Sequence, residues 1–305
     1  MGKKIKLIFN PIANLGRAWS IASSLRPIVQ EFGGADWSGT VFPTHASELA
    51  YTAGLDGYDL VIALGGDGTV HEVVNGLMKL PAEQRPVFGV VPLGSGNDFA
   101  HCLGISSQSE QALRQVLTGT PHPVDVGVVE DNLGRREYWI NTLGFGFDAV
   151  VTIRSRRIPF VHGFAVYFMA VLQTILLNYI PFHLQLKIDD QNQEETDLMF
   201  VACNGKREGG GFMVAPEADL FDGIFDLIAV NKISRLKMLY TLPYFLNGTQ
   251  NKLSYVHSGR FKHLELTSDH PLIIHADGEI YAGFSSKSNR LSIEIIPAGL
   301  RTICG

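Results

Sequence analysis

The chain has 305 residues, of which 46% are hydrophobic and 18% charged, and its formal net charge is −5 with a pI near 6.0. This composition excludes an intrinsically disordered chain, and the acidic balance argues against a general nucleic-acid-binding protein, which usually presents a basic face. Because typical domains have about 100–200 residues, the length predicts two domains.

Cysteine usage and the N-terminal residues both predict a cytoplasmic protein. Cys102, Cys203 and Cys304 are odd in number and far apart, which fits a reducing compartment better than a disulfide framework. A basic cluster follows Met1, but the apolar run at 7–9 is too short for a signal peptide, so none is expected.

Strand-length apolar runs alternate with helical patterns from residue 3 to about residue 119. The runs at 6–9, 58–64 and 87–92 each lead into a turn rich in Gly, Asn or Asp, and each turn opens a helix. This alternation predicts βαβ units and a parallel sheet. Because the carboxyl ends of parallel strands face one crevice, we expect the three turns to converge on a ligand there.

The turn after the second of these strands is the most informative stretch of the chain. It reads Gly65-Gly66-Asp67-Gly68-Thr69-Val70 and leads into an amphipathic helix. Glycine lets the backbone take positive φ and approach a ligand closely, and the first N–H groups of the helix then point at an anion. The turn has no P-loop lysine and does not fit the dinucleotide pattern G-x-G-x-x-G.

We therefore interpret this turn as a phosphate site of an unusual kind. Asp67 would repel phosphates unless a divalent cation intervenes, which indicates a Mg²⁺-nucleotide as the ligand. The alternative is an ordinary strand-to-helix turn in which Asp67 or Thr69 is the N-cap.

From residue 124 onward, successive strands replace the alternating pattern. Turn signals separate them, and only helical stretches at 160–179 and 235–246 interrupt the series. The strands are expected at 124–129, 137–141, 183–188, 198–203, 224–230, 261–266, 272–276 and 291–296. This order predicts an antiparallel β domain, a sandwich, after the α/β domain.

One stretch of the second half, 158–182, contains no Asp, Glu, Lys or Arg and follows three arginines, so it is a candidate transmembrane segment. Its interruptions are Pro159, His162, Gln173, Thr174, Asn178 and Pro181, and its helical stripe is Phe164, Phe168, Val171, Leu172, Ile175 and Tyr179. We expect a helix that covers a β-sheet, with contact between part of it and a membrane surface as the alternative.

Six motifs in order make the sequence resemble the diacylglycerol kinase catalytic-domain family of lipid kinases, in its bacterial form, a family that also includes sphingosine and ceramide kinases. The motifs are Asn10-Pro11 with Gly16 and Ala18, Gly65–Thr69, Pro92–Ala100, Asn141–Ala149, Ala215-Pro216 through Asp222-Gly223, and Asp277-Gly278-Glu279. They span almost the whole chain. One departure is Ser95, where many relatives carry Thr; the hydroxyl is kept.

The resemblance implies an α/β domain with a parallel sheet, of the NAD-kinase and phosphofructokinase type, followed by an antiparallel β-sandwich domain. The first covers 1–122, with 298–305 returning to it, and binds the nucleotide. The second covers 123–297 and binds the lipid, and the chemistry takes place in the cleft.

The resemblance also implies which residues contact ATP. They are Asn10, Thr40, Gly65, Gly66, Asp67, Gly68, Thr69, Val70, Ser95 and Asn97. Asp67 is expected to act through Mg²⁺, directly or by way of water. Two alternatives remain: Asp98 completes the Ser95 loop or is a helix N-cap, and Thr40 contacts the nucleotide or is an ordinary strand-end residue.

Glu279 is the expected general base for the hydroxyl proton, on the strength of the resemblance. Asp277 is then its neighbour or a second carboxylate linked to the metal. By sequence alone an Asp-Gly pair is more often a hairpin turn. His275 is the local rival, because imidazole is the commoner base, although its place on a strand favours a structural role.

A second metal site is expected at Asp219, Asp222 and the carbonyl of Ile224. Carboxylates three residues apart in a turn, with exposed carbonyls nearby, suit the hard oxygen coordination of Mg²⁺. The alternative is a turn in which the aspartates bind only the backbone. Bacterial relatives place a structural Mg²⁺ here, away from the transferred phosphate.

The sequence thus predicts an ATP- and Mg²⁺-dependent kinase of a lipid alcohol such as diacylglycerol or a sphingoid base. An amphiphilic substrate implies peripheral contact with a membrane surface, and a homodimer is compatible with the sequence. Two other classes remain open: an NAD kinase-like enzyme, because NAD kinases also use a GGDGT loop, and a non-catalytic nucleotide- or lipid-binding module.

Overall fold

The computed structural model describes residues 3–158 and 163–305. Its contacts divide the chain into two compact units. Unit 1 comprises Met1–Asp125 and Ala298–Gly305, and unit 2 comprises Val126–Pro297. Strand β5 (Pro121–Asp131), inside which the expected boundary at 122 falls, runs from unit 1 to unit 2, and β15 (Arg290–Ile303) runs back.

Unit 1 is an α/β domain built on a parallel sheet in the order β2-β1-β3-β4. The strands are β1 (Ile5–Phe9), β2 (Asp36–Gly39), β3 (Leu60–Gly65) and β4 (Val87–Pro92), and the helices are η1 (Ala13–Gly16), α1 (Ala18–Glu31), α2 (His45–Leu55), α3 (Asp67–Leu77), η2 (Ala82–Gln84), α4 (Asp98–Cys102) and α5 (Ser109–Thr118). All six residues of β3 are buried, as expected for a strand covered on both faces.

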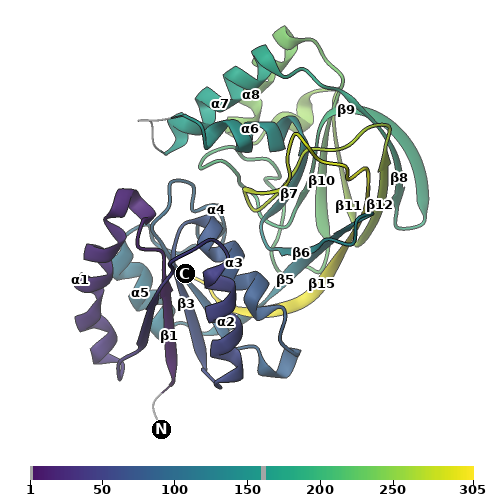
Figure 1. The fold of residues 1–305 in the computed structure, drawn as a ribbon. Coiled ribbons are helices and arrows are strands. Elements are labelled where there is room, and N and C mark those ends of the chain that lie inside the picture. The colour runs from purple at the N-terminus through teal and green to yellow at the C-terminus, as the bar shows by residue number, and fades with distance from the viewer. Residues whose placement is uncertain (1–2, 159–162) are drawn as a thin grey trace. The chain divides into compact units, whose positions relative to one another are not determined.

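The helices of unit 1 cover the two faces of its sheet in pairs (Figure 1). Helix α1 contacts α5, and an ion pair between Arg114 and Glu31 at 2.8 Å joins them, while α2 contacts α3. The last residues of β15 extend the sheet, since Thr302 pairs in parallel with Phe88 of β4. This arrangement brings the ends of β1, β2, β3 and β4 to one edge, where the turns predicted to bind a ligand lie.

Over the residues that the structure describes, unit 2 is an antiparallel β-sandwich accompanied by helices. Its remaining elements are β6 (Arg136–Trp139), β7 (Thr142–Gly146), α6 (Phe147–Ser155), α7 (Phe164–Leu177), β8 (Phe182–Ile188), β9 (Gln191–Cys203), β10 (Phe225–Asn231), α8 (Arg235–Asn247), η3 (Gln250–Lys252), β11 (Val256–Phe261), β12 (His263–Ser268), β13 (Ile274–Ala276) and β14 (Glu279–Ala282). Strand order is β14-β13-β7-β9-β8-β12-β15, with β10 between β9 and β11, and β5 between β15 and β6.

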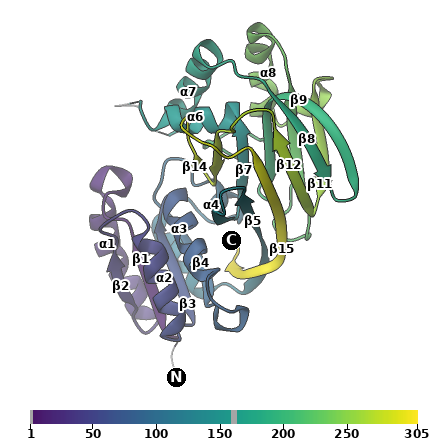
Figure 2. The same cartoon turned by 45° about the vertical axis from the view of Figure 1, so that its right-hand side comes forward.

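Alternation along the strands of unit 2 separates two apolar cores. Phe225, Leu227 and Ala229 of β10 face the core of the sandwich, which also contains Trp139, Phe145, Phe200 and Phe261. Ile228 and Val230 face the other core, where α6, α7 and α8 cover the sheet. Figures 1 and 2 show these three helices together on one side of β7, β9 and β10.

Unit 2 contains elements that the sequence did not predict, and one expectation is met. Gly144 and Gly146 of the Asn141–Ala149 motif belong to strand β7, and Phe147 and Asp148 open helix α6. Helix α7 lies within the predicted 158–182 stretch and buries Val171 and Ile175 against the sheet. Pro159 and His162 lie outside the described residues, and in the remainder no helix is both long and apolar enough to span a bilayer.

Candidate active site

Two glycine-rich turns of unit 1 meet backbone to backbone. A Cβ on Gly94 would lie 2.5 Å from the Cα of Gly66, and one on Gly66 would lie 3.0 Å from the Cα of Gly94. The glycines of these two turns all have negative φ or extended backbone: Gly65, Gly66, Gly68, Gly94 and Gly96. The expectation of positive φ in the Gly65–Val70 turn was therefore wrong. Glycine is required here because there is no room for a Cβ.

The carboxylate of Asp67 ties the two turns together. One of its oxygens accepts the N–H of Asn97 at 2.7 Å, and the other accepts the N–H of Asp98 at 2.9 Å. Burial and the neighbouring Asp98 carboxyl raise the pKa of Asp67 to about 7. The hydrogen bonds from the backbone amides act in the opposite direction and lower this pKa. A cation bound beside Asp67 would favour its ionised form.

The other nucleotide residues predicted from the sequence lie on neighbouring strand ends. The N–H of Asn10 donates to Leu64 of β3 at 3.3 Å, and the N–H of Thr40 donates to Phe9 of β1 at 2.9 Å. Asn97 has φ of +52° and both donates to and accepts from the backbone of Gly94 at 2.8 Å.

The structure therefore brings the predicted nucleotide residues together in unit 1, with Ser95 exposed at the tip of its turn. Thr69 is buried behind Gly65, where a Cβ would meet its hydroxyl. Asn97 precedes α4 at the N-cap position, so the alternative that Asp98 is the N-cap was wrong.

In unit 2, Asp277 and Gly278 form the turn of the hairpin β13–β14. Their φ angles of +52° and +78° are those of a type I′ turn, for which Asp-Gly is a preferred pair. The Asp277 carboxylate is buried and accepts the N–H groups of Asn141 at 2.7 Å, Ile140 at 3.1 Å and Thr142 at 3.2 Å. This side chain holds the hairpin against the start of β7.

Glu279 follows this turn as the first residue of β14, with its side chain 36% exposed. Its carboxylate lies 2.6 Å from the Arg156 guanidinium, which also donates to the carbonyl of Gly278 at 2.8 Å. The hairpin and Arg156 thus hold a partly exposed carboxylate in place, as a general base requires.

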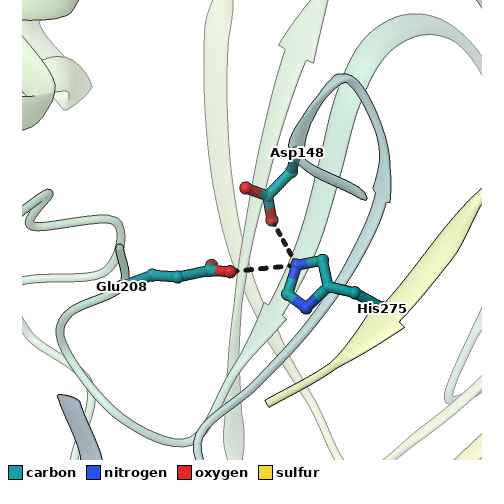
Figure 3. A group of neighbouring side chains, drawn as sticks. All are labelled: Asp148, Glu208 and His275. Atoms are coloured by element: carbon teal, nitrogen blue, oxygen red, sulfur yellow. Dashed lines mark hydrogen bonds and ion pairs between the residues drawn. The ribbon is translucent and has the colours of Figure 1, made fainter. Parts of the chain in front are cut away.

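A second polar group lies four residues before Glu279. The fully buried His275 directs Nε2 at two carboxylates, at 2.8 Å from Asp148 and 3.0 Å from Glu208, as Figure 3 shows. Burial lowers the pKa of His275 and the two carboxylates raise it, but the N–H of Gly278, which points at Nδ1, disfavours a second proton on the ring, so the neutral ring with its proton on Nε2 is the form that fits these contacts. A Cβ on Gly144 would lie 2.3 Å from Nε2, so only glycine leaves room for this group.

Asp148, Glu208 and His275 have the residue types of a metal site, and their ligand atoms lie within 4.8 Å of one another. The hydrogen bond at the other ring nitrogen argues against a metal, because the N–H of Gly278 points at Nδ1 at 3.2 Å. A nitrogen that accepts a hydrogen bond carries no proton, so the proton is on Nε2, and that nitrogen then has no lone pair for a metal.

An apolar cavity of about 80 Å³ in unit 2 has Asp148 and Glu208 in its wall. The rest of the wall is almost entirely apolar and comes from α6, α7, α8, β9 and β10 together with nearby loops; it includes Val151, Val171, Ile175, Met199, Val230, Met238 and Phe245. An apolar chamber with a charged group at one place suits a molecule with a long apolar part and a hydrogen-bonding head.

The predicted metal turn of unit 2 has each aspartate bound to its own backbone. Asp219 accepts the N–H of Phe221 at 3.1 Å, and Asp222 accepts the N–H of Ile224 at 3.2 Å. One oxygen of each carboxylate is used in this way, and hard oxygen ligands remain, so the donor set fits Mg²⁺. The guanidinium of Arg260 lies 3.9 Å from the other oxygen of Asp222.

Three residues of the candidate site in unit 2 were not identified from the sequence: Asp148, Glu208 and Arg156. Asp148 lies in the Asn141–Ala149 motif, to which the sequence assigns no chemistry of its own, and Glu208 precedes a glycine-rich loop at 209–211. That loop is a tight hairpin, in which Glu208 and Phe212 exchange backbone hydrogen bonds at 2.9 Å. No sequence signal joins Asp148, Glu208 and His275, since 60 or more residues separate them.

Comparison with known proteins agrees with this geometry. Residues 4–129 match the model of the diacylglycerol kinase catalytic domain, and residues 141–304 match that of the YegS C-terminal NAD kinase beta sandwich-like domain. The chain belongs to the diacylglycerol kinase catalytic-domain family of lipid kinases. The predicted family and fold are thereby confirmed, and the enzyme is a kinase, a class for which ATP is the phosphoryl donor.

Individual relatives support the assignment over most of the chain. A protein named "Probable lipid kinase YegS-like" from Chromohalobacter salexigens is 36% identical over 76% of this chain and 73% of its own length. A protein named "Diacylglycerol kinase" from Bacillus subtilis is 28% identical over 92% of this chain and 91% of its own length. The crystal structure of a diacylglycerol kinase from Bacillus anthracis has the same fold, with a TM-score of 0.74, 21% identity and coverage of 100% of this chain and 97% of that one.

The close approach of the two turns of unit 1 gives a test of the nucleotide site. In Gly94→Ala the new Cβ must push the turn away from Gly66, and overpacking of this kind costs about 1–3 kcal/mol. We expect the free energy of unfolding to fall by that amount and the affinity for ATP to fall about tenfold or more, measured by urea denaturation and by calorimetric titration. Gly259→Ala is the control, because its nearest neighbours would lie 3.8 Å away; equal ATP affinity in the two variants contradicts the prediction.

Proposed function

We propose that this kinase transfers the γ-phosphoryl group of ATP to the hydroxyl group of a lipid alcohol such as diacylglycerol or a sphingoid base. The observation that carries the proposal is the apolar cavity of unit 2 with Asp148 and Glu208 in its wall. Membership of a lipid kinase family and the glycine-rich turns of unit 1 support the same function.

In this proposal unit 1 binds the nucleotide. The Gly65–Val70 turn directs the N-terminus of α3 at the phosphates, where the helix dipole favours negative charge. The N–H groups of Thr69 and Val70 donate to the Gly66 carbonyl at 2.9 and 3.1 Å and close the first turn of the helix. Asn10, Thr40, Ser95 and Asn97 complete the contacts from the neighbouring strand ends. Asp67 acts on the Mg²⁺ of the nucleotide through water, because both of its oxygens already accept amide hydrogen bonds.

Unit 2 binds the lipid, with the apolar chain between the sheet and helices α6, α7 and α8. Pockets for drug-sized ligands measure about 300–1,000 Å³. The cavity of about 80 Å³ is smaller, so an acyl chain enters by moving these helices apart. Apart from Asp148 of α6, which contacts His275, and Thr241 of α8, whose hydroxyl donates to the Lys237 carbonyl, the helices and the sheet present apolar side chains to the cavity, so the chain meets an apolar surface as the helices move.

The polar head of the lipid lies at Asp148 and Glu208. A single Nε2–H of His275 faces two carboxylates, so these oxygens keep acceptor capacity for a hydroxyl or ammonium donor. His275 also accepts the N–H of Gly278 in the turn that carries Glu279. The head-binding group and the proposed base are therefore connected through one hairpin.

Glu279 is the proposed general base, and Asp277 positions it through the amides of 140–142. The hydroxyl oxygen of the lipid attacks the γ-phosphorus, its proton passes to the Glu279 carboxylate, and ADP leaves. Arg156 stabilises the carboxylate before the reaction and must share it with the hydroxyl during proton transfer.

A second Mg²⁺ is proposed at Asp219, Asp222 and the Ile224 carbonyl, where it would brace the turn before β10. The enzyme is further proposed to work in the cytoplasm as a peripheral membrane protein, since its substrate resides in a bilayer.

Glu279→Gln tests the base. The amide cannot accept the hydroxyl proton, so turnover should fall by at least about 100-fold, while calorimetric ATP binding stays the same. Turnover is measured by mass spectrometry on a panel of diacylglycerol, sphingosine, ceramide and NAD. Glu294→Gln, at an exposed position of β15, is the control. Unchanged turnover in Glu279→Gln refutes its role, and phosphate found only on NAD refutes the lipid substrate.

Asp148→Asn tests the head-binding group. Hydrogen bonds to a charged group contribute about 1.5–3 kcal/mol, so the KM for the lipid should rise about tenfold or more while the KM for ATP is unchanged. Thermal denaturation shows separately whether the variant is folded. Asp190→Asn, on an exposed turn, is the matched control. Equal lipid KM values in the two variants contradict the assignment.

Metal removal tests the second Mg²⁺ site in the protein without nucleotide. A ligand at 100 times its Kd stabilises the native state by about 2.7 kcal/mol, so MgCl₂ should raise the Tm by several degrees relative to EDTA. Asp222→Asn should abolish this difference, and Asp190→Asn should keep it. A Tm that does not respond to Mg²⁺ in the wild-type protein argues against the site.

A further inference from the structure

The outer faces of helices α7 and α8 are apolar, although their inner faces already supply the core. Leu176 and Leu177 at the end of α7 are each 66% exposed, and Leu236 on the first turn of α8 is 79% exposed. The other exposed large apolar residues of these helices are Phe164, Met169, Leu239 and Tyr240. Helices of globular proteins normally present a polar face to water, so these two-sided apolar helices require an explanation.

The exposed apolar residues at the end of α7 and on α8 form one surface, which we call the α7–α8 face and which comprises Leu176, Leu177, Leu236, Leu239 and Tyr240. The Nε of Arg235, at the start of α8, donates to the carbonyl of Ile175 at 3.0 Å, and its guanidinium lies over the ring of Tyr179 at 5.1 Å. These contacts place Leu236 next to the end of α7 with its two exposed leucines, and both ribbon views show the helices side by side (Figures 1 and 2).

Neither α7 nor α8 carries an acidic residue. No Asp or Glu occurs between residues 149 and 188 or between residues 227 and 264. Exposed basic residues accompany the apolar ones at the start of α8: Lys232, Arg235 and Lys237. The protein as a whole has a net charge of −5, so this concentration of positive charge is local.

We propose that the α7–α8 face docks the enzyme onto an anionic lipid bilayer, with the leucines and Tyr240 inserted among the lipids and the basic side chains at the phosphates. Leucine and aromatic residues on one face of a helix with Lys and Arg beside them are typical of helices that lie in the membrane interface. The neighbouring Val171, Ile175 and Met238 of the same helices line the cavity, so a docked enzyme has its proposed lipid site directly beneath the bilayer contact.

A bilayer explains the face better than a second copy of the chain. In a two-fold symmetric dimer the same surface contacts itself, so the basic residues of one copy would meet those of the other, and neither helix carries an acidic residue to pair with them. Anionic phospholipid supplies both the negative charge and the apolar environment that the face requires.

Vesicle co-sedimentation tests this docking. Wild-type protein should bind vesicles of phosphatidylcholine with phosphatidylglycerol and bind weakly to vesicles of phosphatidylcholine alone. The double variant Leu177→Glu with Leu236→Glu should lose about tenfold or more of its binding to the anionic vesicles, because two inserted side chains become charged. Its activity on a water-soluble short-chain lipid alcohol should equal that of the wild-type enzyme.

The matched control is the double variant Leu55→Glu with Leu133→Glu, which adds the same charge at leucines 57% and 62% exposed elsewhere. Glu279→Gln should bind vesicles like the wild-type protein, so that failure of docking and failure of the proposed catalysis are told apart. Equal binding by the two double variants, or equal binding of wild-type protein to neutral and anionic vesicles, overturns the proposal. So does a wild-type dimer that Leu177→Glu with Leu236→Glu dissociates without loss of vesicle binding.

Discussion

Buried carboxylates that accept backbone N–H groups hold the functional turns of both units in place. Asp67 joins the two glycine-rich turns of unit 1, and Asp277 holds the hairpin of unit 2 against the start of β7. Hydrogen bonds to a charged acceptor contribute about 1.5–3 kcal/mol each, and losing the acceptor would leave amides without a partner. Turns of this kind need such an anchor because they have few apolar contacts of their own.

The acidic residues of the site have different roles, because different groups bind their carboxylates. The carboxylate oxygens of Asp67 and Asp277 accept hydrogen bonds from backbone N–H groups, so these two residues position the neighbouring turns. Glu279 is partly exposed and pairs with the exposed Arg156 side chain, so it is the carboxylate best placed to exchange a proton. Asp148 and Glu208 share one imidazole nitrogen, which leaves them acceptors for a ligand. The proposed mechanism follows from these differences in hydrogen bonding rather than from residue type.

The same strands of unit 2 contribute side chains to two separate apolar cores. Alternate residues of β10 face the sandwich core and the helix-covered core, and the second of these contains the cavity. Helices α7 and α8 are in turn apolar on both sides, toward the cavity and toward the proposed membrane contact. A substrate that moves from a bilayer into a protein needs a continuous apolar route, and this layering offers one.

The sequence alone determined the family, the two-part fold and the predicted nucleotide turns, because these depend on short motifs and on local periodicity. The resemblance to the family also indicated Glu279, although its role as base, like those of Asp67 and the Asp219–Ile224 turn, stays a prediction. The tertiary structure alone decided that Gly66 and Gly94 are glycines for lack of space and that Gly144–Gly146 is a strand. It alone assembled Asp148, Glu208 and His275 beside a cavity, since contacts between residues so far apart in the chain leave no local pattern and arise only when strands and helices pack.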